Sequence, residues 1–179
     1  MATVNTSWTS PASATLDKAT GATIDEAMMD ALASNLYHLG GANGYIGCRA
    51  YTTATTSLPN ATILAIAFGG EYFDHDPNGA LHDTSTNNSR ITIRTTGVYH
   101  IGGQGVFDSN ATGYRELRFR ANGVVDLLLD ARTAISGSVH YCMLYGMWPL
   151  VAGDYLEMMA QQTSGGALDV SGNFGVVKA

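Results

Sequence analysis

The stretch YRELRFRANGVVDLLLDA, residues 114–131, decides the fold class of this chain. Asn122-Gly123 near its centre is a preferred dipeptide for a tight β-hairpin turn, because both residues accept a positive φ. On the strand before the turn, Leu117 and Phe119 alternate with charged residues. This alternation is typical of a strand with one buried and one wet face. The stretch therefore predicts an antiparallel hairpin.

The rest of residues 45–179 carries the same kind of signal. Short runs rich in Val, Ile, Tyr, Phe and Thr alternate with turn signals, and the final run, Leu168 to Val176, alternates cleanly. Gly102–Gly105 resembles a phosphate loop, but no helix follows it, so we interpret these residues as strand glycines that permit close packing. The pattern predicts an antiparallel, all-β sandwich or jelly roll of eight to ten strands with no interior helix.

Residues 1–44 differ from the remainder, because they contain the one helical signal, at residues 23–39. Thr23 and Glu26 form a capping box at its start. The apolar stripe of this helix consists of Ile24, Met28, Leu32, Leu36 and Leu39. A single helix of this length is marginal alone, so the stripe must pack on something. It packs either on its own domain or on a partner, as an anchoring arm that includes Trp8.

Composition excludes several function classes. Charged residues make up 13% of the chain and the net charge is −6, with no basic run, so no electrostatic footprint for nucleic acid or an anionic membrane exists. No apolar run approaches the ~18 residues of a membrane span. The first 18 residues lack a charged region followed by an apolar core, so we expect no secretory signal.

The run VHYCMLYGMWPL, residues 139–150, is apolar on both faces of its predicted strand. In a sandwich only one face meets the core, and leaving the other in water forfeits about 1.5–3 kcal/mol per large side chain. We expect another copy of the chain to cover it; the N-terminal helix is the alternative. The predicted self-association residues, extended to the next segment, are Tyr141, Met143, Tyr145, Met147, Trp148 and Tyr155.

A candidate metal loop opens at Asp74-His75-Asp76-Pro77-Asn78-Gly79. A helix-loop-helix calcium site requires a glutamate at its twelfth position, which here is Ser85. A looser calcium cage is left as the weaker alternative, and its ligands would be Asp74, Asp76, Asn78 and Asp83. Zinc through His75 and His82 lacks further ligands. We interpret the stretch mainly as turn formers and polar loop.

The two cysteines, Cys48 and Cys142, lie in strand-like segments far apart in the sequence. We expect small core thiols, with a disulfide between them as the alternative. Neither cysteine has a flanking catalytic pattern, and no Gly-x-Ser-x-Gly elbow occurs. The sequence therefore predicts no enzyme activity and no cofactor.

Several blocks, taken in order, resemble a known family. They are Phe73-Asp74, His82–Asn87, Ser89–Ile93, Gly97-x-Tyr99, Phe119–Gly123, Ala152–Glu157 and Ser164–Leu168. Together they resemble the jelly-roll domain shared by the complement first-component q head and tumour necrosis factor, in the variant found in tailed-bacteriophage virion proteins. The leader, with Trp8, Pro11 and the helical segment, resembles the arm that precedes this domain there.

The resemblance implies a homotrimer of ten-stranded jelly rolls, with inner-sheet aromatics around the three-fold axis and no catalytic centre. It further implies a virion structural protein, made in the host cytoplasm and displayed on the virion surface. We expect a capsid decoration (cement) protein, anchored by residues 1–44 on the major capsid protein or on tail proteins. The alternative is a tail-fibre or head-fibre tip that binds a host receptor or surface glycan.

Overall fold

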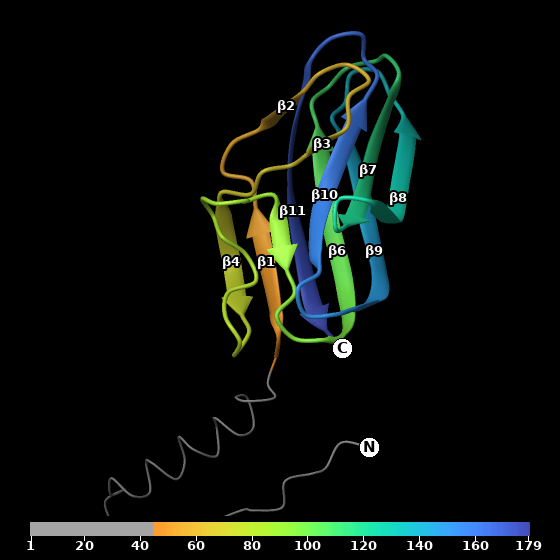
Figure 1. The fold of residues 1–179 in the computed structure, drawn as a ribbon. Helices are drawn as coiled ribbons and strands as arrows, with labels where there is room; N and C mark the ends of the chain where they lie inside the picture. Colours follow the sequence, from red (N-terminus) through yellow and green to blue (C-terminus); the bar gives the residue numbers. More distant parts are fainter. Residues whose placement is uncertain (1–44) are drawn as a thin grey trace, which may run out of the picture. The chain divides into compact units, whose positions relative to one another are not determined.

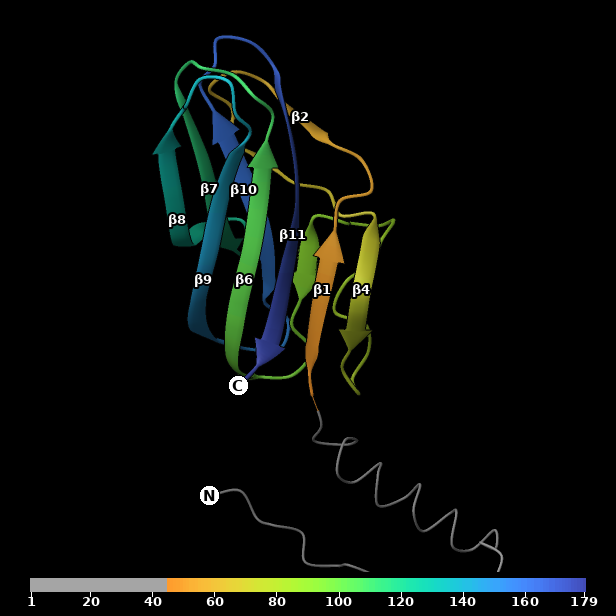
Figure 2. The same ribbon diagram turned by 180° about the vertical axis from the view of Figure 1, so that it is seen from behind.

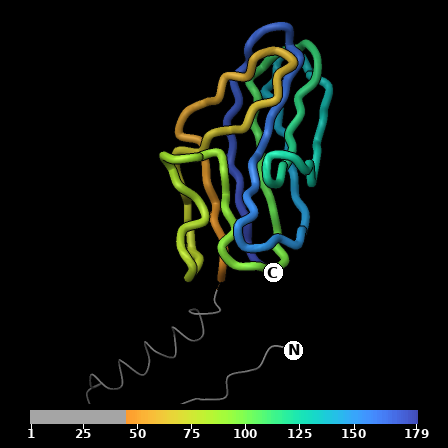
Figure 3. The backbone as a smooth tube through the Cα atoms, in the orientation of Figure 1, coloured from red at the N-terminus to blue at the C-terminus, as the bar shows by residue number. Residues whose placement is uncertain are grey.

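The computed structural model describes residues 45–179, whose backbone Figures 1 and 3 show. These residues form eleven antiparallel strands. The strands are β1 (Gly47–Tyr51), β2 (Thr56–Leu58), β3 (Leu64–Ala65), β4 (Gly70–His75), β5 (Arg90–Thr92), β6 (Gly97–Phe107), β7 (Tyr114–Ala121), β8 (Val125–Thr133), β9 (His140–Leu150), β10 (Tyr155–Gln162) and β11 (Leu168–Lys178). The predicted helix at residues 23–39, its apolar stripe and Trp8 lie outside the described residues. Across residues 45–179 no helix has the length and apolar character that a membrane crossing requires.

The strands are arranged in two sheets that face each other. Sheet A has the order β4-β1-β11-β6-β9, with β2 also paired to β11. Sheet B has the order β3-β10-β7-β8, with β5 also paired to β10. Figure 1 shows sheet B in front and Figure 2 shows sheet A in front. The predicted all-β antiparallel sandwich is confirmed, but the described part has eleven strands rather than ten. Three of them, β2, β3 and β5, are two or three residues long, too short for a visible period of alternation.

The core between the sheets is lined by alternate residues of each long strand. On β11 the predicted alternation is confirmed, since Leu168, Val170, Phe174 and Val176 are all buried. The Phe174 ring lies 5.0 Å from the ring of Phe119 on the opposite sheet. A side chain at Gly103 would place its Cβ 3.0 Å from the Phe119 ring. The glycine therefore permits the close packing that the sequence predicted for this segment.

The predicted hairpin joins β7 to β8, and its turn has the expected backbone. Asn122 and Gly123 have φ values of 52° and 73°. The Val124 N–H donates to the Ala121 carbonyl at 3.1 Å and closes the turn. The Asn122 side chain also donates to Asp154 Oδ1 at 2.9 Å and accepts from the Tyr155 N–H at 3.0 Å. This one residue therefore ties the hairpin to the loop that precedes β10.

We expect Asn122→Ala to lower the free energy of unfolding by about 1–3 kcal/mol, because it removes two hydrogen bonds and places alanine at a positive φ. Asn122→Gly is the matched control, since it removes the same bonds without backbone strain. Urea denaturation of both variants measures the effect. Equal destabilisation by the two substitutions would show that the backbone strain contributes nothing.

Both cysteines are free and buried, as the sequence predicted. Cys48 lies on β1 and Cys142 on β9, and two further strands of sheet A separate them. Three inter-strand steps amount to roughly 14 Å, whereas a disulfide requires Cα atoms within about 7 Å. The alternative of a Cys48–Cys142 disulfide is therefore wrong for this fold.

We expect neither thiol to react with a disulfide reagent at pH 8 in the folded protein. Burial, reinforced by the carboxylates of Asp74 and Glu71, raises the pKa of Cys48 well above its usual range. Burial, followed by Asp130, raises the pKa of Cys142 to about 11. Because the thiolate is the reactive form, both groups stay inert below these pKa values. Both should react once denaturant is added, and rapid reaction in buffer alone would contradict the burial.

Candidate functional site

The outer face of sheet A carries a row of large apolar side chains that the described domain does not cover. Along β9 the inward residues Cys142 and Leu144 are buried, whereas the alternate residues project outward. We call these outward residues the β9 face: Tyr141, Met143, Tyr145 and Met147, exposed by 51%, 61%, 70% and 53%. The strand has two apolar faces, as its sequence indicated, and the core accommodates only one of them. The β9 face is therefore the candidate binding surface of the domain.

Two of the six predicted self-association residues lie elsewhere. Trp148 is paired with Tyr99, whose side chain is fully buried, so it lies on the inner side of sheet A at the exposed edge. Tyr155 lies on β10, in sheet B, because the chain changes sheets between β9 and β10. Its ring is covered there by the guanidinium of Arg90, 4.1 Å from the centroid. The structure therefore groups the four residues of the β9 face and separates the other two.

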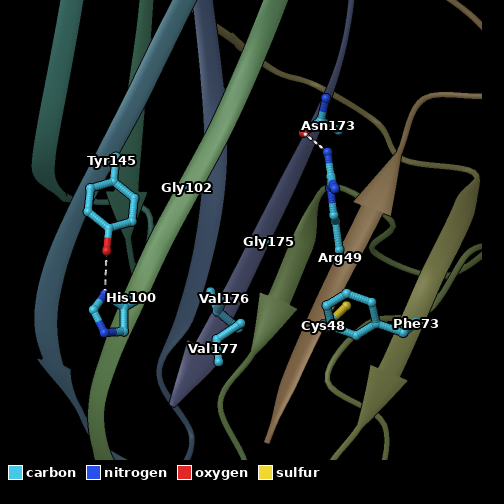
Figure 4. Close-up of a pocket in the computed structure, with 10 residues that line it drawn as sticks. All are labelled: Cys48, Arg49, Phe73, His100, Gly102, Tyr145, Asn173, Gly175, Val176 and Val177. Atoms are coloured by element: carbon cyan, nitrogen blue, oxygen red, sulfur yellow. Dashed lines mark hydrogen bonds between the residues drawn. The ribbon is translucent and has the colours of Figure 1, made fainter. Parts of the chain in front are cut away.

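A pocket lies beside the β9 face, where two glycines stand next to each other on neighbouring strands. The pairing register places Gly102 of β6 opposite Tyr145 on one side and opposite Gly175 of β11 on the other. Beyond them, Arg49 of β1 pairs with Gly175. The missing side chains leave a pocket of about 290 Å³. Figure 4 shows Tyr145 along one side and Arg49 along the other, with the two glycine positions between.

The two glycines have different structural roles. A Cβ at Gly175 would lie 2.8 Å from the backbone oxygen of Cys48, so the packing of β1 on β11 requires glycine there. A Cβ at Gly102 would lie 3.6 Å from Tyr145 Cδ2, which is an ordinary contact. The fold of the single chain therefore does not require glycine at position 102. Its effect is to leave the pocket open on the outer face of sheet A.

The side chains around the pocket are held in place by their own contacts. A hydrogen bond of 2.6 Å joins Tyr145 Oη to His100 Nδ1, and the two rings stack. Across the pocket, Arg49 Nη2 donates to Asn173 Oδ1 at 3.3 Å, as Figure 4 shows. The arrangement offers an aromatic wall, a cation and an open floor. These are features of a binding surface, and they supply no activated nucleophile or paired acid and base.

The candidate calcium ligands already make hydrogen bonds to other groups of the domain, and the side chains of Asp76 and Asn78 both bond to the Thr95 hydroxyl. Asp74 accepts from the N–H groups of residues 81 and 82, at 3.0 and 2.9 Å. Asp76 accepts from the Asn78 N–H at 2.8 Å, while its Oδ2 is buried without a partner among the described residues. Asp83 Oδ1 accepts from residues 85 and 86, and these bonds lower its pKa to about 2. In residues 45–179 no three His, Cys, Asp or Glu residues are placed to hold a metal ion.

The two histidines of the zinc alternative lie in different environments, and neither belongs to a cluster of metal ligands in residues 45–179. His82 is buried, with Nδ1 2.8 Å from Glu71 Oε1 and Nε2 3.0 Å from the Asn88 carbonyl oxygen. Both ring nitrogens therefore already have partners within the domain. His75 is exposed at the end of β4. The interpretation of this stretch as a set of turns and a polar loop accounts for its contacts.

Comparison with solved structures identifies the fold. No family model matches the chain, and no curated protein matches it. The globular domain of zebrafish complement 1qA protein is similar over 73% of this chain and 94% of its own length, with 12% identity and a TM-score of 0.55. Murine APRIL is similar over 75% of this chain and 99% of its own, with 15% identity and a TM-score of 0.55. Eiger TNF from S. frugiperda is similar over 75% and 92%, with 17% identity and a TM-score of 0.53. The described domain therefore has a jelly-roll fold like those of tumour necrosis factor and the complement 1q head.

Proposed function

We propose that this protein is a non-enzymatic assembly module that forms a homotrimer through the outer face of sheet A, and that the trimer decorates a bacteriophage capsid. The observation that carries the proposal is the β9 face, four large apolar side chains that are each more than half exposed in the single chain. An apolar cluster of this kind on a soluble domain marks an interaction surface.

Another copy of the chain is the occupant that the chemistry of this face favours. In a closed symmetric assembly every copy buries the same face, so no apolar surface is left over. Burying a methionine side chain contributes about 1.5–3 kcal/mol, and two methionines lie on each β9 face. The pocket kept open by Gly102 is available for a side chain of the neighbouring copy. The family resemblance of the sequence supports a three-fold arrangement.

The capsid location rests on the resemblance of residues 1–44 to the arm of phage virion proteins. In this proposal the arm, with Trp8 and its apolar stripe, docks on the major capsid protein, and the trimer stabilises the shell by burial across subunits. A receptor- or glycan-binding fibre tip is the second candidate. A polar cavity on sheet B, lined by Asp83, Arg90 and Arg94, favours it as an additional role.

Light scattering tests the assembly. We expect a mass three times the 18.8 kDa of one chain at micromolar concentration. A stable particle of one chain's mass would overturn the trimer. Particle composition tests the location: a copy number in proportion to the capsid lattice supports decoration, and a few copies at one vertex or at the tail support a fibre tip.

Deletion of residues 1–39 should abolish incorporation, and normal incorporation of the truncated trimer would overturn the anchoring role.

A further inference from the structure

A second cavity, of about 340 Å³, lies on the outer side of sheet B, away from the β9 face. It is bounded by the segment at residues 80–87, by β5 and by the start of β10. Its volume falls at the lower end of the roughly 300–1,000 Å³ of small-molecule sites. The lining residues that offer charge, hydrogen bonds or an aromatic ring include Asp83, Asn87, Arg90, Thr92, Arg94 and Tyr155.

Strand pairing places an arginine over a tyrosine at one wall of this cavity. Tyr155 pairs with Thr92 and Glu157 pairs with Arg90, so all four side chains project from the same outer face. The Arg90 guanidinium lies 4.1 Å from the centroid of the Tyr155 ring. Its Nε donates to Glu157 Oε1 at 3.1 Å. These contacts fix the plane of the guanidinium, and its two terminal nitrogens remain available for a ligand.

The second arginine of the cavity has no acidic partner within residues 45–179. Arg94 Nε donates to the carbonyl oxygen of Ala80 at 2.9 Å, which holds the side chain at the cavity. In contrast, the other arginines on the outer face of sheet B, Arg118 and Arg120, are both paired with Asp126. The terminal nitrogens of Arg94 therefore supply a cationic, fork-shaped donor group that the described domain does not use.

The rest of the lining offers acceptors and neutral polar groups. Asp83 Oδ1 takes its three hydrogen bonds from Ser85 and Thr86, and Oδ2 has none among the described residues. Thr92 and Asn87, which carry a hydroxyl and an amide, line the same cavity. The two guanidiniums favour a ligand with a carboxylate, since guanidinium and carboxylate match in geometry. The Asp83 carboxylate disfavours a doubly charged phosphate and suits a hydroxyl donor instead.

We propose that this cavity binds a sugar that carries a carboxylate, with the carboxylate at Arg94 and Arg90 and ring hydroxyls at Asp83, Asn87 and Thr92. A uronic acid and a sialic acid share this chemistry. The proposal does not depend on the trimer, because the cavity lies on sheet B and the β9 face lies on sheet A. In an assembly formed through sheet A the cavity remains open to solvent.

Calorimetric titration of the full chain with galacturonate, the methyl α-glycoside of N-acetylneuraminic acid (its carboxylate free) and galactose tests the site. Galactose differs from galacturonate in lacking the carboxylate at C6. We expect saturable binding of at least one acid, at least about ten-fold tighter than binding of galactose, the size of one lost charged hydrogen bond. The stronger of the two acids identifies the uronic or the sialic class.

Arg94→Gln should weaken binding of that acid by about ten-fold or more for the same reason. Arg132→Gln is the matched control, because Arg132 is an exposed arginine of β8 outside the cavity, and it should leave the affinity unchanged. No saturable binding of either acid, equal binding of galactose, or full affinity in Arg94→Gln would overturn the proposal. A chain made monomeric by Tyr145→Glu should keep full affinity, so failure of the trimer and failure of this site are distinguishable.

Discussion

Tyr145→Glu is expected to convert the trimer into a folded monomer of 18.8 kDa. Tyr145 is the most exposed member of the β9 face, at 70%, so replacing its ring costs the single chain only the exposed hydrogen bond and ring contact with His100. In the proposed trimer the same position is buried against other copies. Three carboxylates would then have to leave water for an apolar interface without a partner, and each unpaired buried charge costs several kcal/mol. Light scattering reports the three-fold fall in mass, and circular dichroism reports whether the strands are intact.

The matched control is Val124→Glu, which adds the same charge at a position that is 78% exposed in the turn between β7 and β8. This variant should remain a trimer, because the hairpin turn belongs to sheet B and lies away from the β9 face. A trimer that persists in Tyr145→Glu would show that the outer face of sheet A is not the assembly surface. Dissociation of both variants would show that the added negative charge itself disrupts the trimer, wherever it lies, and would contradict assembly through the β9 face.

Arg115→Met is expected to lower the free energy of unfolding by about 2–4 kcal/mol. The Arg115 side chain is fully buried at the start of β7, with no carboxylate partner in the described domain. Its Nη2 donates to the Asn110 carbonyl at 2.9 Å, and Nη1 donates to the carbonyls of Thr112 and Tyr114, both at 3.0 Å. Methionine fills most of the same volume but donates nothing, so three part-buried hydrogen bonds are lost, at about 0.5–1.5 kcal/mol each. The Tyr114 carbonyl still accepts from the Thr163 N–H at 3.2 Å. Part of this loss is offset because the charge no longer has to be desolvated, the same effect that lowers the pKa of Arg115.

Urea denaturation compares this variant with Arg132→Met, in which an exposed arginine of the neighbouring strand β8 is replaced in the same way. The control should unfold at the urea concentration of the unmodified protein. Both measurements are made in the Tyr145→Glu background, so that trimer dissociation does not contribute to the unfolding curve. A stability loss in Arg115→Met no larger than in the control would mean that the three carbonyls find water instead.

The sequence determined the parts of the fold that depend on one strand at a time. Asn122-Gly123 specified the hairpin because few residue pairs accept two successive positive φ values. The alternation of β11 specified its buried side, and the two apolar faces of β9 indicated that a single core could not accommodate both. Each of these features is local, since it follows from backbone sterics or from the two-residue period of a strand.

What lies side by side across strands was decided only by the tertiary structure. Tyr155 follows β9 closely in sequence yet lies in the other sheet, because the chain crosses between the layers at residues 151–154. Gly102 and Gly175 are 73 positions apart, and only the register of β6 with β11 makes them the floor of one pocket. The pattern of a single strand contains no information on that register beyond which residues face inward.

The environment of Arg115 depends both on the local sequence pattern and on the tertiary structure. Alternation with Leu117 and Phe119 places it on the inward side of β7, and this could be inferred from the sequence. A buried arginine is normally paired with a carboxylate. No carboxylate of the described domain pairs with Arg115. The tertiary structure instead directs three carbonyl groups of residues 110–114 at the guanidinium. Which side of the strand a residue occupies is set by local period, whereas what meets it there is set by how the loops fold back over the sheet.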